Sequence, residues 1–338
     1  MDATRLSVYF GDSLDSGPRP AGDALLRCFA EHRFPAAALL RGIEGFGLNR
    51  RIHAERFPDL STDLPLLATA IGEPGGIRHA REEVDGLVSR GLVTTEDVRL
   101  VSGSDLPHAA PPGTGEHAKL TVYCTAGERG RRRPAYKEVV AALRARGAAG
   151  AIVLIGVDGV LHNRRRRAKL FSRGAHGLRI VVSVGPVEPL LECVRELGSM
   201  LEAPIATIEA VDVVKHDGQA LMSPPATGGD AITKWRAISV YSRRSAHVDG
   251  RPLYSELTQR LREQGGAGAT TVVGDWGFSS DEHPHGDRLG RVASHLPTLT
   301  VTVDEPERLA GVWRAIDRAT SCHGVVTSSA VAGYRDWS

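Results

Sequence analysis

The stretch GPRPAGDALLRCFAEHRFPAAALLRG, residues 17–42, recurs twice more in this sequence of 338 residues. Residues 131–156 read RRRPAYKEVVAALRARGAAGAIVLIG, and residues 249–274 read DGRPLYSELTQRLREQGGAGATTVVG. The three stretches align without a gap, and each contains an Arg-Pro pair, an amphipathic segment and an apolar run that ends in glycine. Repetition of this kind is the signature of a repeat architecture, so we expect three copies of one structural unit.

Each unit is predicted to contain four strands and two helices in the order βαββαβ. The segments RLSVYF, KLTVYC and AISVYS precede the three stretches and alternate as a half-buried first strand does. Apolar residues four apart then predict a helix that begins just after each Arg-Pro pair. The second strands are expected to end at Gly42, Gly156 and Gly274, and the second helices to begin at Pro74, Pro186 and Pro306. This order predicts an α+β fold of three tandem ferredoxin-like domains, each with two helices on one antiparallel sheet.

Segments rich in proline, glycine and small residues separate the units, as tethers between domains do. They divide the chain into repeat 1 (1–103), a linker (104–118), repeat 2 (119–218), a second linker (219–235) and repeat 3 (236–338).

The composition is that of a globular protein, with 41% hydrophobic and 24% charged residues. No apolar run approaches the length that spans a bilayer, and the N-terminal residues MDATRLSVYF lack the pattern of a secretory signal. The cysteines stand far apart without a CxxC pair, which predicts reduced thiols and no zinc site built from cysteines. We therefore expect a cytoplasmic protein with no cofactor and no membrane span.

Basic residues are concentrated in repeat 2, which has 17 basic and 10 acidic residues. Most of the excess lies in GERGRRRP (127–134) and HNRRRRAK (162–169). Two interpretations remain open: solvated loop arginines, or a patch that attracts phosphate, nucleic acid or an acidic partner.

The unit resembles a known family. A first strand ending in Val-Tyr, a GRPLY-type turn, and a second strand running into R-G-x-x-G-F-G before a histidine-containing loop resemble the PII-like proteins of a branch catalogued as a domain of unknown function. Repeat 1 has RGIEGFG with His53, and repeat 3 has GRPLY (250–254) and GDWGF with His285. The resemblance implies a pseudo-threefold PII-like trimer, which one chain supplies here as a monomer. It also implies small effectors, usually adenine nucleotides, in clefts between domains, and long loops that contact a protein target.

The resemblance places the effector clefts at the end of each second strand. Glycines there would let a ligand approach backbone N–H groups, and arginines would bind its anionic group. The alternative is that the glycines serve the backbone conformation only. The predicted effector-binding residues are Arg41, Gly42, Gly45, Phe46, Gly47, Arg50 and His53 in repeat 1, Gly156 and Gly159 in repeat 2, and Gly274, Trp276, Gly277, Phe278 and His285 in repeat 3. Repeat 1 has the fullest set, so we expect the best-preserved cleft there.

The function that follows is a non-catalytic regulatory protein that senses a small anionic effector and acts on a partner through its long loops. One alternative is a metal-binding protein or metal-dependent hydrolase that uses Asp281, His283, His285 and Asp287 in repeat 3. A second alternative is weak nucleic-acid binding through the repeat 2 arginines, although the predicted third strands lack the aromatic residues of RNA-recognition domains.

Overall fold

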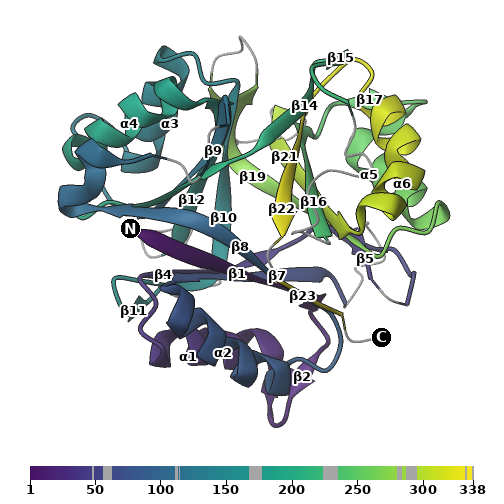
Figure 1. Ribbon diagram of the computed structural model, residues 1–338, viewed down its shortest axis with the longest axis horizontal. Helices are drawn as coiled ribbons and strands as arrows, with labels where there is room; N and C mark the ends of the chain where they lie inside the picture. Colours follow the sequence, from purple (N-terminus) through teal and green to yellow (C-terminus); the bar gives the residue numbers. More distant parts are fainter. Residues whose placement is uncertain are drawn as a thin grey trace.

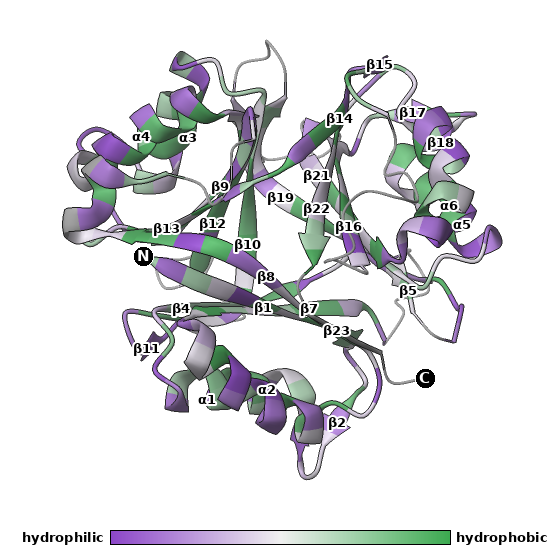
Figure 2. Ribbon diagram, in the orientation of Figure 1, coloured by the Kyte–Doolittle hydropathy of each residue, from purple (hydrophilic) through white to green (hydrophobic). Residues whose placement is uncertain are grey.

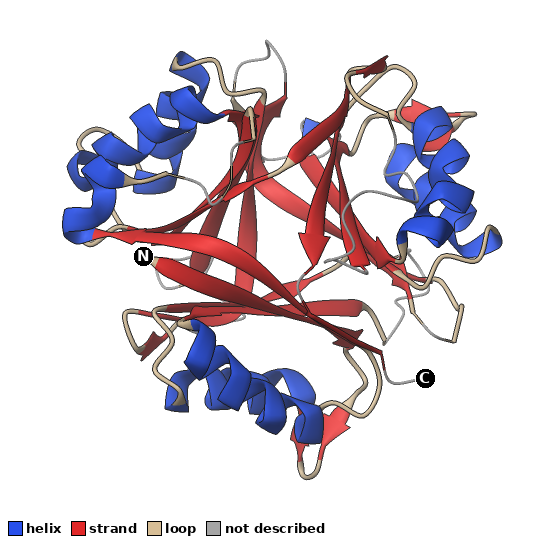
Figure 3. Ribbon diagram, viewed as in Figure 1, coloured by secondary structure: helices blue, strands red, loops and turns tan. Residues whose placement is uncertain are grey.

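The computed structural model describes residues 1–47, 49–55, 63–110, 113, 115–166, 177–223, 235–279, 284–286, 295–331 and 333–336. Within these residues each repeat has the order βαββαβ, with two helices on one face of an antiparallel sheet (Figure 3). In Figure 1 the three helix pairs lie on the outside of the molecule, and the three sheets face its centre.

Repeat 1 shows the arrangement that the other repeats share. Its elements are β1 (Asp2–Gly11), α1 (Ala21–Glu31), β4 (Ala36–Arg41), β7 (Pro65–Gly72), α2 (Pro74–Leu87) and β8 (Leu92–Ser102). Strand β1 pairs with both β7 and β8, and β4 pairs with β7, so the antiparallel order is β4-β7-β1-β8. Short hairpin strands β2 (Asp15–Ser16) and β3 (Arg19–Pro20) precede α1, and β5 (Glu44–Phe46) and β6 (His53–Ala54) follow β4.

Repeats 2 and 3 follow the same order. Repeat 2 contains β9 (His117–Thr125), α3 (Ala135–Ala145), β10 (Gly150–Leu161), β11 (Arg164–Arg165), β12 (Leu178–Pro186), α4 (Val187–Met200), β13 (Ile205–Ala210), β14 (Asp212–His216) and β15 (Gln219–Ala220). Repeat 3 contains β16 (Trp235–Arg243), β17 (His247–Val248), β18 (Arg251–Pro252), α5 (Leu253–Glu263), β19 (Ala269–Ser279), β20 (His285–Gly286), β21 (Pro297–Asp304), α6 (Pro306–Ala319), β22 (Val325–Val331) and β23 (Gly333–Asp336). A short 3₁₀ helix, η1 (Gly103–His108), follows repeat 1.

The prolines begin the helices much as predicted. Helices α1, α3 and α5 start directly after Pro20, Pro134 and Pro252, and α4 starts one residue after Pro186 rather than at it. Proline has no N–H to donate and a fixed φ, so it suits the start of a helix. Figure 2 shows hydrophobic and hydrophilic residues interleaved along each helix, which is the pattern of an element packed on one side.

The predicted ends of the second strands are wrong for repeats 2 and 3. Strand β10 continues beyond Gly156 to Leu161, and β19 continues beyond Gly274 to Ser279. Each strand changes partner near its glycine: Val153 of β10 pairs with Val181 of its own repeat, whereas Val160 pairs with Ala37 of repeat 1. The second strands extend beyond their glycines because the backbone groups of the extension find hydrogen-bond partners on the neighbouring repeat.

We call this pairing of strands from different repeats the strand exchange. It closes a cycle around the centre of the molecule. Strand β5 of repeat 1 pairs with the start of β19, the end of β19 pairs with the start of β10, and the end of β10 pairs with β4 of repeat 1. The fourth strands close a second cycle, since β8 pairs with β13, β14 pairs with β22, and β23 pairs with the start of β8. Each repeat therefore covers strand edges of both neighbours.

The core has two parts. Each repeat packs its helices on its own sheet, as Leu25 and Phe29 of α1 do on repeat 1. A further apolar cluster at the centre draws on all three repeats, with Leu40, Ile180 and Leu299 among its buried members. The helices thus stabilise single repeats, and the central cluster holds the repeats together.

Candidate functional site

A cavity with a volume of about 420 Å³ lies between repeats 1 and 3. Repeat 1 contributes the end of β1, strand β5 with the following Gly47, and the turn before β8. Repeat 3 contributes the start of β19 and the inner residues Val301 and Val303 of β21. The cavity sits where β5 crosses onto β19, so a molecule bound there would contact both repeats.

The cavity wall is mainly apolar. Its larger apolar side chains are Tyr9, Phe10, Leu14, Phe46, Pro65, Leu92, Val301 and Val303. Phe46 is 6% exposed and belongs to the core of repeat 3, so it anchors β5 between the two repeats. Burial raises the pKa of Tyr9, which keeps its phenol protonated at neutral pH.

Polar groups lie at one part of the cavity wall. His53 Nε2 lies 3.8 Å from Asp63 Oδ2, and the backbone N–H of Ser13 donates to Asp63 Oδ1 at 3.0 Å. Asn49 accepts the backbone N–H of Arg51 at 3.1 Å. Arg90, in the turn before β8, is exposed and lines the same cavity. These residues give the wall a carboxylate, an imidazole, an amide and a guanidinium.

The structure brings together only part of the predicted repeat 1 set. Gly45, Phe46, Gly47 and His53 line the cavity. Arg41 does not, because its guanidinium pairs with Asp12 at 2.6 Å.

Gly42 and Arg50 also lie outside the cavity lining. The N–H of Gly42 donates to Pro65 O at 2.8 Å, and the N–H of Arg50 donates to Gly47 O at 2.8 Å. Arg50 has a left-handed backbone, with φ of 53°, so it closes a turn after β5.

Most of the glycines predicted as effector residues have a packing explanation at the points where strands of two repeats pair. A Cβ on Gly42 would lie 2.9 Å from Thr271 O, and one on Gly274 would lie 2.8 Å from Val153 O. A Cβ on Gly159 would lie 2.6 Å from Ala37 O. Gly45 and Gly277 are similarly crowded, by Ala269 O at 2.4 Å and by Ala151 O at 2.2 Å. A Cβ on Gly156 would instead meet Leu178 of its own repeat at 3.0 Å. At the other five glycines the neighbouring repeat fills the space, which accounts for glycine there without a ligand.

The cleft between repeats 2 and 3 is much smaller, with a volume of about 30 Å³. Phe278 lines it, whereas Trp276 does not. Instead, the Nζ of Lys137 in α3 lies 3.8 Å from the centre of the Trp276 ring, a cation–π contact. Beside it Asp275 pairs with Arg179 at 3.1 Å, and burial raises the pKa of Asp275. His285 lies in β20, opposite Gly277, and its side chain is outside the described residues.

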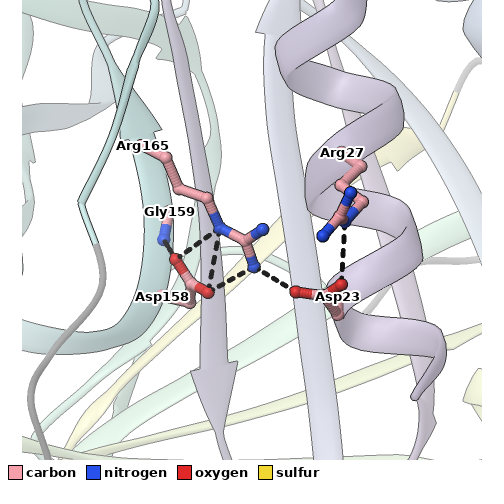
Figure 4. A network of polar contacts seen from close by, with 5 residues as sticks. All are labelled: Asp23, Arg27, Asp158, Gly159 and Arg165. Carbon is pink, nitrogen blue, oxygen red and sulfur yellow. Dashed lines mark hydrogen bonds and ion pairs between the residues drawn. The ribbon is translucent and has the colours of Figure 1, made fainter. Parts of the chain in front are cut away.

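An ion-pair network occupies the contact between repeats 2 and 1 (Figure 4). Arg165 of β11 donates to Asp158 at 2.6 Å and to Asp23 of α1 at 2.5 Å. Asp158 also accepts the N–H of Gly159 at 2.8 Å, and Asp23 accepts from Arg27 at 3.0 Å. The hydrogen bond from Arg165 lowers the pKa of Asp23. Here the chain supplies its own guanidinium beside Gly159, one of the predicted effector residues.

The sequence prediction missed many repeat 1 residues that line the cavity, among them the polar residues Asp63, Ser89 and Arg90. Gly91, before the fourth strand, has a counterpart in Gly324 of repeat 3, and both have positive φ. Such a glycine indicates a turn and does not indicate a binding site. The repeat 3 wall at 267–270 was also missed. Only the pairing of β5 with β19 brings it near Gly45.

Parts of the alternative sites lie outside the described residues. These include Asp281, His283 and Asp287 of the proposed metal loop and residues 167–176 of the arginine-rich segment. The three long loops predicted at residues 43–63, 157–177 and 275–295 are also partly outside the described residues. No described helix has the length and apolarity needed to cross a membrane.

Comparison with known proteins agrees with the threefold repetition. The model of the DUF190 family, described as "Uncharacterized ACR", matches residues 3–100, 117–213 and 235–332. A similar curated protein is the "UPF0166 protein" of Aquifex aeolicus (strain VF5), which is 24% identical over 78 residues, 23% of this chain and 74% of that protein. The matches confirm the resemblance to the uncharacterised PII-like branch in all three repeats.

Proposed function

We propose that this chain, which belongs to the DUF190 family, is a non-catalytic regulatory protein that binds a small anionic effector between repeats 1 and 3. In this proposal the three repeats form a PII-like pseudo-trimer within a monomeric cytoplasmic chain. The effector changes the long loops that contact a protein target. Membership of a PII-like family supports the regulatory role.

The observation that carries the proposal is the cavity of about 420 Å³ shared by two repeats. Small-molecule sites are commonly about 300–1,000 Å³, mostly apolar, and equipped with a few polar groups. Phe46, Val301 and Val303 offer contacts for a flat apolar ring, and Arg90 offers a charge-assisted contact for an anionic group. An adenine nucleotide has both parts, so it heads the ligands to be tested.

The position of the cavity fits signalling better than turnover. The wall joins β5, which continues toward the long loop of repeat 1, to the start of β19 in repeat 3. A ligand that binds both walls favours the conformation in which they are closest, and so couples the loop to the strand crossing. The Asp63 carboxylate accepts from the backbone of Ser13 and pairs with His53, which suits it to holding the loop end.

A thermal-shift screen against nucleotides, cyclic nucleotides and small anions tests the proposal, because a ligand that binds only the folded chain raises its stability. Isothermal titration of the best ligand then compares the wild type with Arg90→Ala. Loss of a charge-assisted contact costs about 1.5–3 kcal/mol, so we expect a Kd about ten- to a hundredfold weaker.

Two controls place the site. Arg41→Ala removes an arginine that pairs with Asp12 outside the cavity lining, and Arg244→Ala removes one that directly follows β16 and also lies outside the lining. Both variants should retain the wild-type Kd. Gly47→Leu places a side chain at a cavity-lining position whose Cβ meets no atom within 4 Å, so it should weaken binding without disturbing the fold. Equal Kd values in Arg90→Ala and the wild type would contradict the proposed site.

A further inference from the structure

Three side chains with metal-binding atoms converge between the two outer helices of repeat 1. Cys28 lies on α1, His32 follows its last residue, and Glu83 lies on α2. The Cys28 Sγ, a His32 ring nitrogen and a Glu83 carboxylate oxygen all lie within 4.8 Å of one another. His32 keeps helical backbone angles, so the four-residue spacing puts Cys28 and His32 on one face of the helix.

The group is fixed on the inside and open on the outside. Cys28 is 4% exposed, whereas the side chain of Glu83 is 54% exposed. His32 Nε2 lies 3.0 Å from Glu83 Oε1, and the His32 ring stacks on Phe34 with centroids 5.6 Å apart. Phe34 is itself buried, so it holds the imidazole in place. An ion approaching from solvent would meet Glu83 first and the thiol last.

The aligned positions in repeat 2 show which contact joins the two helices where no metal-binding side chain is present. The gapless alignment places Ala142 and Arg146 where repeat 1 has Cys28 and His32. Arg146 forms an ion pair with Glu196 of α4 and lies 3.8 Å from Glu192. A helix-to-helix ion pair is therefore enough to join these elements, and it requires no cysteine.

Repeat 3 gives the same comparison. Its aligned residues are Arg260 and Gln264, and Arg260 pairs with Glu256 of its own helix at 2.6 Å. Repeat 1 thus has metal-binding side chains at both aligned positions, Cys28 and His32, whereas repeats 2 and 3 do not. It also keeps a carboxylate on the second helix, as repeat 2 does.

We propose that Cys28, His32 and Glu83 form a zinc site on the outer face of repeat 1. Thiolate, imidazole and carboxylate together are the ligand set of Zn²⁺, which prefers a tetrahedron of Cys, His and Asp or Glu. With metal–ligand distances of about 2.0–2.3 Å, neighbouring ligand atoms lie about 3.4 Å apart, so small rotations of the three side chains complete the set. The thiol releases its proton to solvent, bonds to S, N and O form, and a water molecule takes the fourth position.

Cobalt binding to the full chain tests the proposal directly. Co²⁺ substitutes for Zn²⁺ and reports a thiolate ligand through a sulfur-to-metal charge-transfer absorption in the near ultraviolet. We expect one equivalent of Co²⁺ to produce this band, and one equivalent of Zn²⁺ to abolish it. The band should disappear in Cys28→Ser and persist in Cys322→Ser, whose thiol is exposed and lies in repeat 3.

Variants that leave the core intact keep the test decisive. Glu83→Gln changes an exposed side chain and should weaken Zn²⁺ binding at least about tenfold, whereas Glu82→Gln on the same helix should not. The double variant Ala142→Cys, Arg146→His builds the same set beside Glu196 and should add a second equivalent of bound metal.

Other outcomes overturn the proposal. A thiolate band that survives in Cys28→Ser, or the absence of stoichiometric binding by the wild type, would exclude the site. Binding that survives in Glu83→Gln but disappears in His283→Ala, His285→Ala would assign the metal to the repeat 3 loop instead.

Discussion

Arg5 donates both terminal N–H groups to the carboxylate of Glu209 at 2.5 Å, although 204 residues separate the two in sequence. Both side chains are buried. Arg5 also donates to Glu96 at 2.9 Å, and Lys119 pairs with Glu209 at 3.1 Å. The first and fourth strands of repeats 1 and 2 thus share one buried network of two cations and two anions at the centre of the molecule.

Removing Arg5 should destabilise the chain strongly. Arg5→Ala leaves Glu96 without its cation and takes the bidentate partner from Glu209, and breaking a buried pair costs about 3–5 kcal/mol. Urea unfolding followed by circular dichroism measures the difference in free energy of unfolding.

Repeat 3 supplies the control for this variant. Ala237 and Ser329 pair across the strands at the positions that Arg5 and Glu96 occupy in repeat 1, so cation and anion are absent there together. The double variant Arg5→Ala, Glu96→Ser copies that arrangement and should lose less stability than Arg5→Ala alone. A double variant that is the less stable of the two would contradict this interpretation of the network.

Acid should weaken the same network. Burial alone would raise the pKa of Glu209, but Arg5 and Lys119 outweigh it and the pKa is lowered. A carboxylate with a lowered pKa stabilises the fold above its unfolded pKa, near 4.5, and that stabilisation is lost as the pH falls through the folded value. The free energy of unfolding should therefore decline below about pH 4.5.

Comparison with a variant isolates the contribution of Glu209 to this decline. Asp275 and Asp304 have pKa values raised by burial, so their contributions to stability change with pH in the opposite direction. Glu209→Gln should give a shallower dependence of unfolding free energy on pH between about pH 3 and pH 5. Identical slopes in the variant and the wild type would mean that Glu209 is not held ionised in the fold.

Alanine at the strand crossings should be costly. Gly274→Ala places a methyl group 2.8 Å from Val153 O and 2.6 Å from the Ile152 side chain, and overpacking of this kind costs about 1–3 kcal/mol. The matched control is Gly311→Ala in α6, where a Cβ meets nothing within 4 Å and alanine should stabilise the helix by about 0.5–1 kcal/mol. The melting temperature should fall in Gly274→Ala and rise in Gly311→Ala. Equal melting temperatures in the two variants would contradict the packing role of Gly274.

Local patterns in the sequence predicted the elements well but not their partners. The prolines at 20, 134 and 252 mark helix starts because proline restricts its own backbone, which is a local effect. The continuation of β10 to Leu161 depends instead on Ala36, which lies in another repeat. No period within residues 150–161 reports that contact, so the strand was predicted to end at the glycine.

The candidate site shows the same division. Phe46 and His53 belong to a motif that can be read along the chain, and both line the cavity. Arg41 belongs to the same motif, yet Asp12 draws its guanidinium away. Arg90 and Gly268 enter the cavity from segments without a motif, one of them from repeat 3. The residues of a site shared between repeats can therefore be identified only when the pairing of strands between the repeats is known.

The strand exchange also predicts the assembly state. Each repeat covers edges of its neighbours in two closed cycles, so the full chain should be a monomer of 36.1 kDa by light scattering. Repeat 2 alone (residues 117–217) would leave both ends of β10 and the inner residues Ile180 and Val182 uncovered. Unpaired strand edges and an exposed apolar face drive association, so isolated repeat 2 should not stay monomeric.

Charges at the contacts between repeats favour a trimer as the assembly that isolated repeat 2 forms. In the chain, Asp158 lies near Asp23 of the next repeat and needs Arg165 between them, while Trp276 at the aligned position contacts Lys137. Three copies of repeat 2 in the same cycle would place Asp158 beside Lys137, an attractive pair. Isolated repeat 2 should therefore form a trimer, and Asp158→Lys should weaken it by setting a third positive charge beside Lys137 and Arg165. A folded monomer of repeat 2 would show that the exchange is not what holds the repeats together.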